Sequence, residues 1–203
     1  MRSKQLHSTC PEAQSHCVAL LLAAGKGRRF GSDKRQARLA DGQTLLAASV
    51  GNAQAQFAEV WVVIGADDDP QALGLPMSVQ LVRAPRGSDG MGASLAAGMQ
   101  ALAGSPAEAV AVLLGDMPWI AGATLARLQQ AAGAELIVMP HCHGQRGHPV
   151  LFGRAFWAAL GESSGDQGGR QVLRDNAHAC RVIEVIDAGV LRDVDTPGDL
   201  SPP

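Results

Sequence analysis

Glycine and cationic residues are concentrated in one short segment, which runs from Gly25 to Arg35 and follows an apolar stretch from Val18 to Leu22. Glycine lets a backbone approach a ligand closely, so that several N–H groups can point at one anion. Mobile positive charge would come from Lys26, Arg28, Arg29, Lys34 and Arg35. The composition therefore predicts a loop that wraps a polyphosphate, with a solvated turn as the alternative.

The spacing within this segment excludes two common phosphate loops. A Walker loop places its lysine directly after the last glycine, whereas Gly31 is followed here by Ser32-Asp33-Lys34. The dinucleotide fingerprint G-x-G-x-x-G fails because Phe30 occupies its sixth position. The pattern L-A-A-G-x-G-x-R-[FM]-G-x-x-K instead resembles the loop of nucleotidyltransferases that activate a phosphate monoester with an NTP.

Two carboxylate positions are candidates for a metal site. Asp116 follows the apolar run Ala109 to Leu114, and a carboxylate there can hold Mg²⁺ over a triphosphate, since Mg²⁺ takes one or two protein oxygens. A turn or helix-capping aspartate is the alternative. Asp193 and Asp195 are alternate residues of a short extended piece and can share one face, so one of them could be the second carboxylate. Thr196-Pro197 could equally begin a short final helix.

Two further segments carry unusual residues. Gly87 to Leu95 is a second glycine-rich turn, which could embrace a base and a ribose or simply begin a capped helix. His141-Cys142-His143 could ligate a transition metal or form a polar loop that borders a substrate cleft. The cysteines contain no C-x-x-C pair, so we expect reduced thiols at Cys10, Cys17, Cys142 and Cys180.

Alternating elements must position these residues. Short apolar runs at 18–22, 59–64, 79–82, 109–114 and 135–139 predict strands that are buried on both faces, and alanine-rich segments at 44–57, 93–103 and 124–132 predict helices. This alternation predicts a single doubly wound, mostly parallel sheet with helices on both faces. The loops after Leu22, Val82, Leu114 and Met139 should then converge on one cleft.

Length and charge are consistent with one enzyme domain. The chain has 203 residues and a net charge of −2, so no global basic field would attract nucleic acid. No apolar run reaches the length of a membrane span. Residues 1–17 are polar and predict a disordered leader, residues 18–200 predict the folded domain, and a cytoplasmic location is expected.

Six ordered motifs between Val18 and Leu200 carry a specific resemblance. They are LAAGKGRRFGSDK, GMGASLAAG, LLGDMP, GQRGHPVLF, GDQGGR and DVDTPGDL. With them the chain resembles the MobA-like NTP transferases, and within that group the molybdenum cofactor cytidylyltransferases. The resemblance implies a Rossmann variant like that of nucleotide-diphospho-sugar transferases. It also implies Mg²⁺-dependent transfer of CMP from CTP to the phosphate of the molybdopterin-bound molybdenum cofactor, with release of pyrophosphate. A molybdenum hydroxylase or its maturation factor would be a further partner.

The resemblance also assigns residues. Lys34 and Arg28 would contact the triphosphate and act in catalysis with Asp116, and Asp116 and Asp195 would hold Mg²⁺. Guanosine-specific relatives usually read A-G-G where this chain has Ala23-Ala24-Gly25, which implies CTP. Residues assigned to the nucleotide are Leu22, Ala23, Ala24, Gly25, Gly27, Arg28, Lys34, Arg83, Ser88, Gly92, Ser94 and Gly115, and residues assigned to the acceptor are Gly147, His148, Pro149, Asp166, Gly168 and Arg170.

The chain departs from its relatives after the lysine. They commonly continue with an apolar segment and a proline, as in K-L-L-P, whereas Lys34 is followed here by Arg35-Gln36-Ala37-Arg38. The additional cations could serve another acceptor. Two alternatives to the implied function therefore stay open: transfer to a sugar phosphate or other small phosphate, and a non-catalytic chaperone that holds a pterin cofactor for a partner enzyme.

Overall fold

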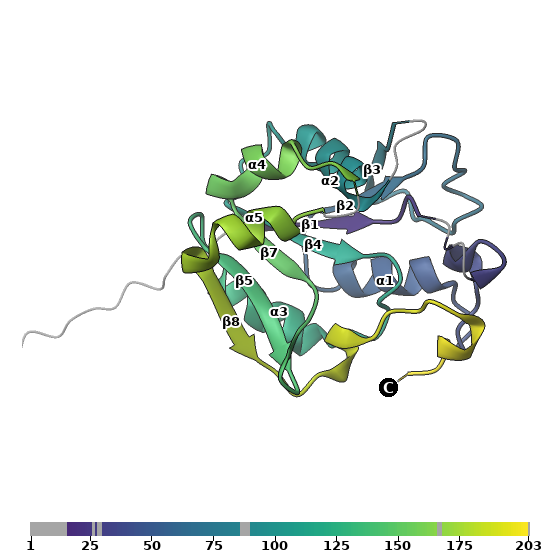
Figure 1. Ribbon diagram of the computed structural model, residues 1–203. Helices are drawn as coiled ribbons and strands as arrows, with labels where there is room; N and C mark the ends of the chain where they lie inside the picture. Colours follow the sequence, from purple (N-terminus) through teal and green to yellow (C-terminus); the bar gives the residue numbers. More distant parts are fainter. Residues whose placement is uncertain (1–15, 26, 28–29, 86–89, 166–167, 203) are drawn as a thin grey trace, which may run out of the picture.

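The computed structural model describes residues 16–25, 27, 30–85, 90–165 and 168–202. Within these residues the chain folds around one mixed sheet, with helices packed on it (Figure 1). The strands are β1 (Cys17–Leu22), β2 (Val60–Ile64), β3 (Gln80–Arg83), β4 (Ala109–Leu114), β5 (Ile137–Cys142), β6 (Gln145–Arg146), β7 (Val150–Gly153) and β8 (Cys180–Glu184).

Four parallel strands form the half of the sheet that carries the glycine-rich segment, in the order β3-β2-β1-β4. On the far side of β4 lies the antiparallel strand β7, followed by β5, and β8 pairs with β5 in parallel. Parallel neighbours require crossover connections, which run through helices except between β2 and β3, where residues 65–79 form turns and no helix. The predicted α/β fold with a mostly parallel sheet is therefore confirmed. The antiparallel strands β6 and β7 within it were not predicted.

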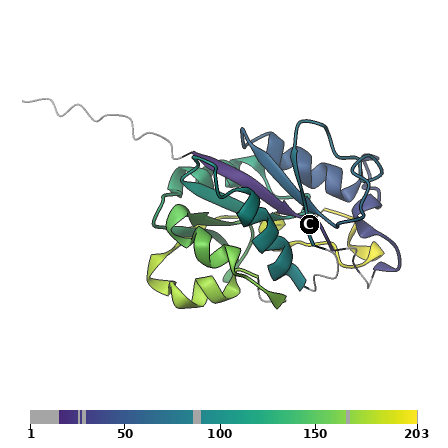
Figure 2. The same cartoon turned by 90° about the horizontal axis from the view of Figure 1, so that it is seen from above.

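Helices cover both faces of the sheet (Figures 1 and 2). Side chains alternate along β1, so that Ala19 and Leu21 join the core beneath α1 (Leu45–Gln54) and α3 (Gly122–Ala131). Leu20 and Leu22 join the core beneath the helices of the other face, which are α2 (Gly90–Ala101), α4 (Trp157–Gly161) and α5 (Arg170–Asp175). No helix of the described residues is long and apolar enough to cross a membrane.

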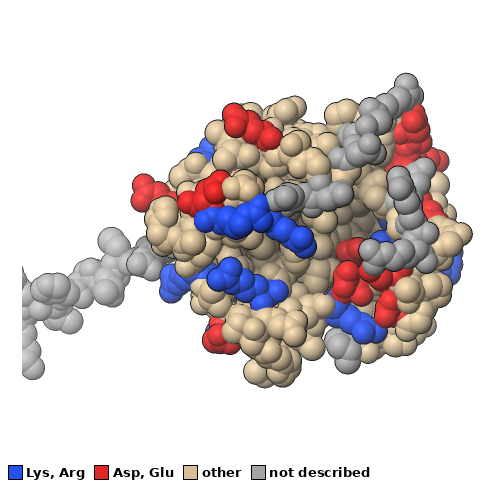
Figure 3. Space-filling view, in the orientation of Figure 1, with Lys and Arg blue, Asp and Glu red and all other residues tan. Residues whose placement is uncertain are grey.

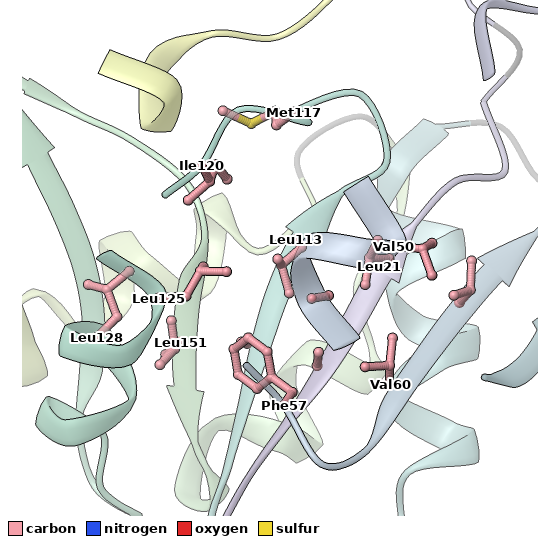
Figure 4. Packing of buried hydrophobic residues seen from close by; sticks show 14 of the residues in the cluster. Leu21, Val50, Phe57, Val60, Leu113, Met117, Ile120, Leu125, Leu128 and Leu151 are labelled. Carbon is pink, nitrogen blue, oxygen red and sulfur yellow. The ribbon is translucent and has the colours of Figure 1, made fainter. Parts of the chain in front are cut away.

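The core beneath α1 and α3 holds the carboxyl ends of β1 and β4, from which two loops begin. Leu21 of β1 and Leu113 of β4 pack with Val50 of α1 and Leu125 of α3, and all four are nearly inaccessible to solvent (Figure 4). The hydroxyl of Thr44 caps α1 by accepting a hydrogen bond from the backbone N–H of Ala47 at 3.2 Å. The ends of β1 and β4 are therefore held rigidly in register.

Most predicted elements exist, with shifted ends. The strand predicted at 79–82 is β3, but it is not buried on both faces: Leu81 is 44% exposed because β3 lies at the edge of the sheet. The strand predicted at 135–139 continues to Cys142, and β1 begins at the buried Cys17 rather than at Val18. The leader predicted for residues 1–17 falls almost entirely outside the described residues.

Candidate functional site

A cleft of about 810 Å³ opens at the carboxyl ends of the parallel strands. The space-filling view shows a hollow with acidic side chains gathered on one side and lysine and arginine side chains on the other (Figure 3). The loops after Leu22, Val82 and Leu114 line the cleft as predicted. The loop after Met139 does not, because β5 continues past it. The lining includes Leu22, Ala23, Ala24, Gly25, Gly27, Lys34, Arg35, Gly65, Ala66, Asp67, Asp68, Ala84, Pro85, Met91, Ser94, Gly115 and Asp116.

Lys34 lines this cleft and belongs to the short 3-10 helix η2 (Lys34–Gln36). Its Nζ donates to Asp116 Oδ2 at 2.8 Å and to the backbone carbonyl of Val194 at 2.7 Å, and it lies 3.5 Å from Asp195 Oδ1. Only 10% of its side chain is exposed. Gly27 covers the stem of this lysine, and a Cβ at Gly27 would lie 2.7 Å from Lys34 Cδ. The structure thus brings Gly27, Lys34, Asp116 and Asp195 together.

One carboxylate oxygen of Asp116 is available to a further ligand. Its Oδ2 accepts from Lys34, but its Oδ1 is buried and has no hydrogen-bond partner among the described residues. A buried carboxylate oxygen without a donor is costly to leave unpaired. A cation held between Asp116 and Asp195 would satisfy it. The donor set of two carboxylates beside a cleft suits a hard divalent cation, which takes its remaining ligands from phosphates and water.

A C-terminal strap, defined here as residues 187–200, brings Asp195 to this position. Val194 is fully buried, its N–H donates to the Asp116 carbonyl at 3.0 Å, and its own carbonyl accepts from Lys34. Further along the chain, the Thr196 and Asp199 side chains form a capping box around the short 3-10 helix Pro197–Asp199. The capped final turn weighed for this motif is thus present, whereas the role of Asp195 as the second metal-binding carboxylate stays a prediction.

Arg35 points away from solvent, contrary to the expectation that it could serve an acceptor. It is 3% exposed, and its guanidinium contacts the carboxylates of Asp33 and Asp68 and the carbonyl of Ala23. Hydrogen bonds from Arg35 hold the pKa of Asp33 below its ordinary value, despite partial burial that raises it. Arg38 is exposed and donates to the carbonyl of Gly42.

The loop after β2 forms a wall of the cleft that the sequence did not reveal. The N–H of Gly65 donates to Asp68 Oδ2 at 2.7 Å, which turns this loop back on itself. Arg83, which was assigned to the nucleotide, donates instead to the carbonyls of Ala66 and Asp68, both at 2.9 Å. It does not line the cleft. The run of three aspartates after an apolar strand, at 67–69, is the only signal that could have identified this wall.

The second glycine-rich turn contributes unequally. Ser94 of α2 is buried and lines the cleft, whereas Gly92 does not. A Cβ at Gly92 would lie 2.6 Å from the backbone of Ser164, so this glycine permits close packing between α2 and the segment that follows α4. Arg28, Ser88 and Asp166, which were also assigned to the site, lie outside the described residues.

His148 lies close enough to Asp116 for that carboxylate to influence the pKa of its imidazole. Its backbone N–H donates to the Val190 carbonyl at 2.8 Å, while its Nδ1 is buried with no hydrogen-bond partner among the described residues. Burial lowers the pKa of His148, and Arg170 lowers it further, against the opposite influence of Asp116 and Asp193. A neutral imidazole therefore faces this region at pH 7.

The neighbours of His148 fix the backbone there. A Cβ at Gly147 would lie 2.5 Å from the carbonyl oxygen of Val190, so only glycine allows the chain to approach the strap this closely. Pro149 is buried, Gly168 has a positive φ of 48° and packs against Met91, and the exposed Arg170 begins α5.

His141, Cys142 and His143 do not converge on one point. His141 Nδ1 lies 2.7 Å from Glu184 Oε1, Cys142 is fully buried in the core, and His143 is an exposed turn residue with φ 49°. No group of three or more potential metal ligands occurs among the described residues. The segment does not line the cleft either.

Comparison with known proteins identifies the family and the fold of this chain. The family described as MobA-like NTP transferase domain matches residues 19–181. A comparison with curated proteins finds no significant match. Among solved structures, Rv0371c from Mycobacterium tuberculosis H37Rv is 26% identical with a TM-score of 0.75, covering 93% of this chain and 96% of its own.

Two further structures share the fold at lower identity. Rv0371c in complex with manganese is 23% identical with a TM-score of 0.75, covering 91% of this chain and 96% of its own. The 4-diphosphocytidyl-2C-methyl-D-erythritol synthase of Anaerococcus prevotii is 16% identical with a TM-score of 0.72, covering 92% and 93%. These two likenesses show the fold alone.

Proposed function

Because the chain belongs to the MobA-like NTP transferase domain family, we propose that it transfers CMP from CTP to the phosphate of a molybdopterin-bound molybdenum cofactor and releases pyrophosphate. The observation that carries the proposal is the arrangement of Lys34 between Asp116 and Asp195 at the head of a cleft large enough for a nucleotide. The acceptor is inferred from the ordered motifs, above all the GQRGHPVLF segment around His148.

Asp116 and Asp195 would hold a divalent cation, which we propose to be Mg²⁺. The unpartnered Asp116 Oδ1 fits such a cation, and the manganese complex of Rv0371c provides a precedent in a protein of this fold. When bound, the cation would neutralise and orient phosphate oxygens.

The residues of the chain would act mainly by position and charge. An acceptor phosphate that is already ionised at pH 7 needs little general base catalysis, so the enzyme must chiefly align it with the α-phosphorus of CTP. Lys34 would stabilise negative charge as pyrophosphate departs, together with Arg28 of the same loop. The one G-x-S-x-G match in the sequence, Gly161 to Gly165, follows the end of helix α4 rather than a strand, so it is not a strand–turn–helix nucleophile elbow, in keeping with direct transfer.

Nucleotide choice would depend partly on Ala24. This residue lines the cleft directly after the buried Ala23, at the position where guanosine-specific relatives usually have glycine. Its methyl group would reduce the room for a purine. CTP is therefore the proposed donor.

The acceptor would bind beside His148, whose imidazole is neutral at pH 7, and the exposed Arg170 would supply charge for its phosphate. A sugar phosphate is the competing acceptor, and mass spectrometry of the products separates the two. A non-catalytic pterin chaperone would have no need of Lys34 and Asp116 in this arrangement.

The decisive experiment measures pyrophosphate release with each of the four NTPs and purified molybdenum cofactor. We expect release with CTP, and an Asp116→Asn variant should lose turnover by roughly two to three orders of magnitude, the scale of a key electrostatic group. Asp41→Asn is the matched control, because Asp41 is exposed and accepts hydrogen bonds from the backbone and side chain of Gln43 outside the cleft. Absence of release with every NTP, or near-normal turnover by a folded Asp116→Asn variant, would contradict the proposal.

A further inference from the structure

Every N–H donor of the Arg35 side chain has a protein acceptor. Nε and Nη2 donate hydrogen bonds to the two oxygens of Asp33 at 2.8 and 2.6 Å. Nη1 and Nη2 donate to the two oxygens of Asp68, and the Nη2 hydrogen bond measures 2.9 Å. The remaining N–H of Nη1 donates to the Ala23 carbonyl at 2.8 Å. An arginine carries five such donors in a fixed planar fork, and here all of them are engaged.

The three acceptors of Arg35 belong to three different walls of the cleft. Ala23 directly follows β1, lines the cleft and precedes the glycine-rich segment. Asp33 caps η2 and directly precedes Lys34. Asp68 closes the loop after β2 by accepting from the N–H of Gly65. One buried guanidinium therefore sets the relative positions of these three walls.

This saturation excludes a role for Arg35 as a phosphate ligand. To bind a phosphate oxygen, Arg35 would have to give up a hydrogen bond to a carboxylate that is itself only 24% exposed, in Asp33, or 5% exposed, in Asp68. Leaving either carboxylate buried and unpaired is strongly unfavourable. The two carboxylates also more than cancel its charge. Arg35 lines a phosphate cleft without being available to a phosphate.

We infer that Arg35 is a positioning residue that fixes the nucleotide cleft of this enzyme. Its loss would let the Ala23–Gly25 wall and the Gly65–Asp68 wall move independently and would free the turn that presents Lys34. Lysine cannot replace it, because an ammonium has three donors without the planar fork and cannot grip two carboxylates bidentately. The inference rests on the proposed nucleotide transfer, since it concerns the binding of that nucleotide.

Arg154 offers a matched control at the opposite end of β4. Its guanidinium also joins segments of backbone, donating to the carbonyls of Ala103 at 2.9 Å and Ser105 at 2.6 Å, and it stacks 4.3 Å from the Trp157 ring. The backbone N–H of Arg154 donates a hydrogen bond to the carbonyl of Glu108, just before β4 begins. Arg154→Lys should therefore lower stability without disturbing the cleft, which opens where β4 ends.

The experiment titrates CTP with Mg²⁺ into the wild type, Arg35→Lys and Arg154→Lys by isothermal calorimetry. No acceptor is present, and each protein is kept well below its unfolding temperature. Arg35→Lys should bind CTP about tenfold more weakly or worse, because misplacement by about 1 Å is enough for large losses in such sites. Arg154→Lys should bind within about twofold of the wild type, since its contacts lie outside the cleft.

The outcomes separate this inference from the proposed function. A folded Arg35→Lys variant with wild-type CTP affinity overturns the inference alone, as does equal weakening by Arg154→Lys. If Arg35→Lys does not fold, Asp33→Asn provides the test. This variant removes the carboxylate that pairs with Nε and Nη2 of Arg35, so it should also bind CTP more weakly than the wild type. Unchanged CTP affinity of Asp33→Asn would then overturn the inference. A wild type that does not bind CTP overturns both proposals.

Discussion

Removing Lys34 should destabilise the fold chiefly through the carboxylates that it leaves behind. At an effective dielectric constant of about 20, unit charges about 3 Å apart attract by about 5 kcal/mol, but burial of the charges offsets part of this. Breaking a buried pair by removing one partner costs about 3–5 kcal/mol. Because Asp116 is 23% exposed and Asp195 is 47% exposed, water softens the loss, so Lys34→Ala should cost about 3 kcal/mol.

The cause of this loss can be tested by a double-mutant cycle with Asp116→Asn. The asparagine still offers an oxygen to Lys34 and should cost only about 1 kcal/mol. In the double variant no charged Asp116 remains to be left unpaired, so the double variant should be about 2 kcal/mol more stable than the sum of the single effects predicts.

Urea denaturation at pH 7 in the presence of EDTA measures all four proteins. For a domain of this size, the expected loss in Lys34→Ala corresponds to a fall of about 6–12 °C in the unfolding temperature. In a second series without EDTA, Mn²⁺ should raise the stability of Lys34→Ala more than that of the wild type, because Asp116 and Asp195 have lost the ammonium of Lys34 in that variant. Additivity within about 0.5 kcal/mol would refute the ion-pair reasoning.

Three further outcomes follow from the same structure. Lys34→Ala should lower kcat for pyrophosphate release more than it raises KM for CTP, since charge on the leaving group grows towards the transition state; a higher KM with unchanged kcat would make Lys34 a ground-state clamp. Ala24→Gly should relax the preference for CTP over GTP, measured as a ratio of kcat/KM values, by no more than the roughly 1–3 kcal/mol that a methyl-sized change provides; an unchanged ratio would place selection elsewhere. Asp33 has a lowered pKa, so its contribution to stability is present at neutral pH and lost as pH falls below about 4, and Asp33→Asn should flatten the acid side of the stability profile. Parallel acid profiles for the two proteins would exclude that linkage.

Strands could be predicted from the sequence where the pattern of apolar residues matches the burial of the strand in the folded protein. The runs at 18–22 and 109–114 are apolar throughout because helices cover both of their faces, so they could be recognised as parallel strands. The exposed strand β8 and the two-residue strand β6 carry no such signal. Both strands pair with β5: β8 does so through a long-range contact that no local pattern encodes, and β6 does so through a tight hairpin whose two residues are too short a run to show strand periodicity.

The candidate site divides in a similar way. Lys34, Asp116 and Asp195 could be proposed from motif spacing, and they do lie together. The roles of Arg35 and Gly92 could not be predicted, because both depend on contacts that form only in the folded chain. In the sequence, an arginine that faces solvent cannot be told from one that pairs with buried carboxylates. Arg35 is buried because it meets Asp68, which comes from a loop more than 30 positions away.

The charge balance of the described part of the cleft favours the proposal that a cation binds together with the nucleotide. Among the described residues, Lys34 and Arg35 are surrounded by the carboxylates of Asp33, Asp68, Asp116 and Asp195. Two cations among four carboxylates leave a negative centre, which would repel a triphosphate at these short distances. A divalent cation on Asp116 and Asp195 would reverse that sign and release the Lys34 ammonium from its ion pairs towards the phosphates. Because Arg35 stays bound to its own carboxylates, Lys34 is the cation of this pair that can respond. The glycine-rich segment would therefore bind phosphate through backbone N–H groups, Lys34 and the metal acting together, rather than through its cationic residues alone.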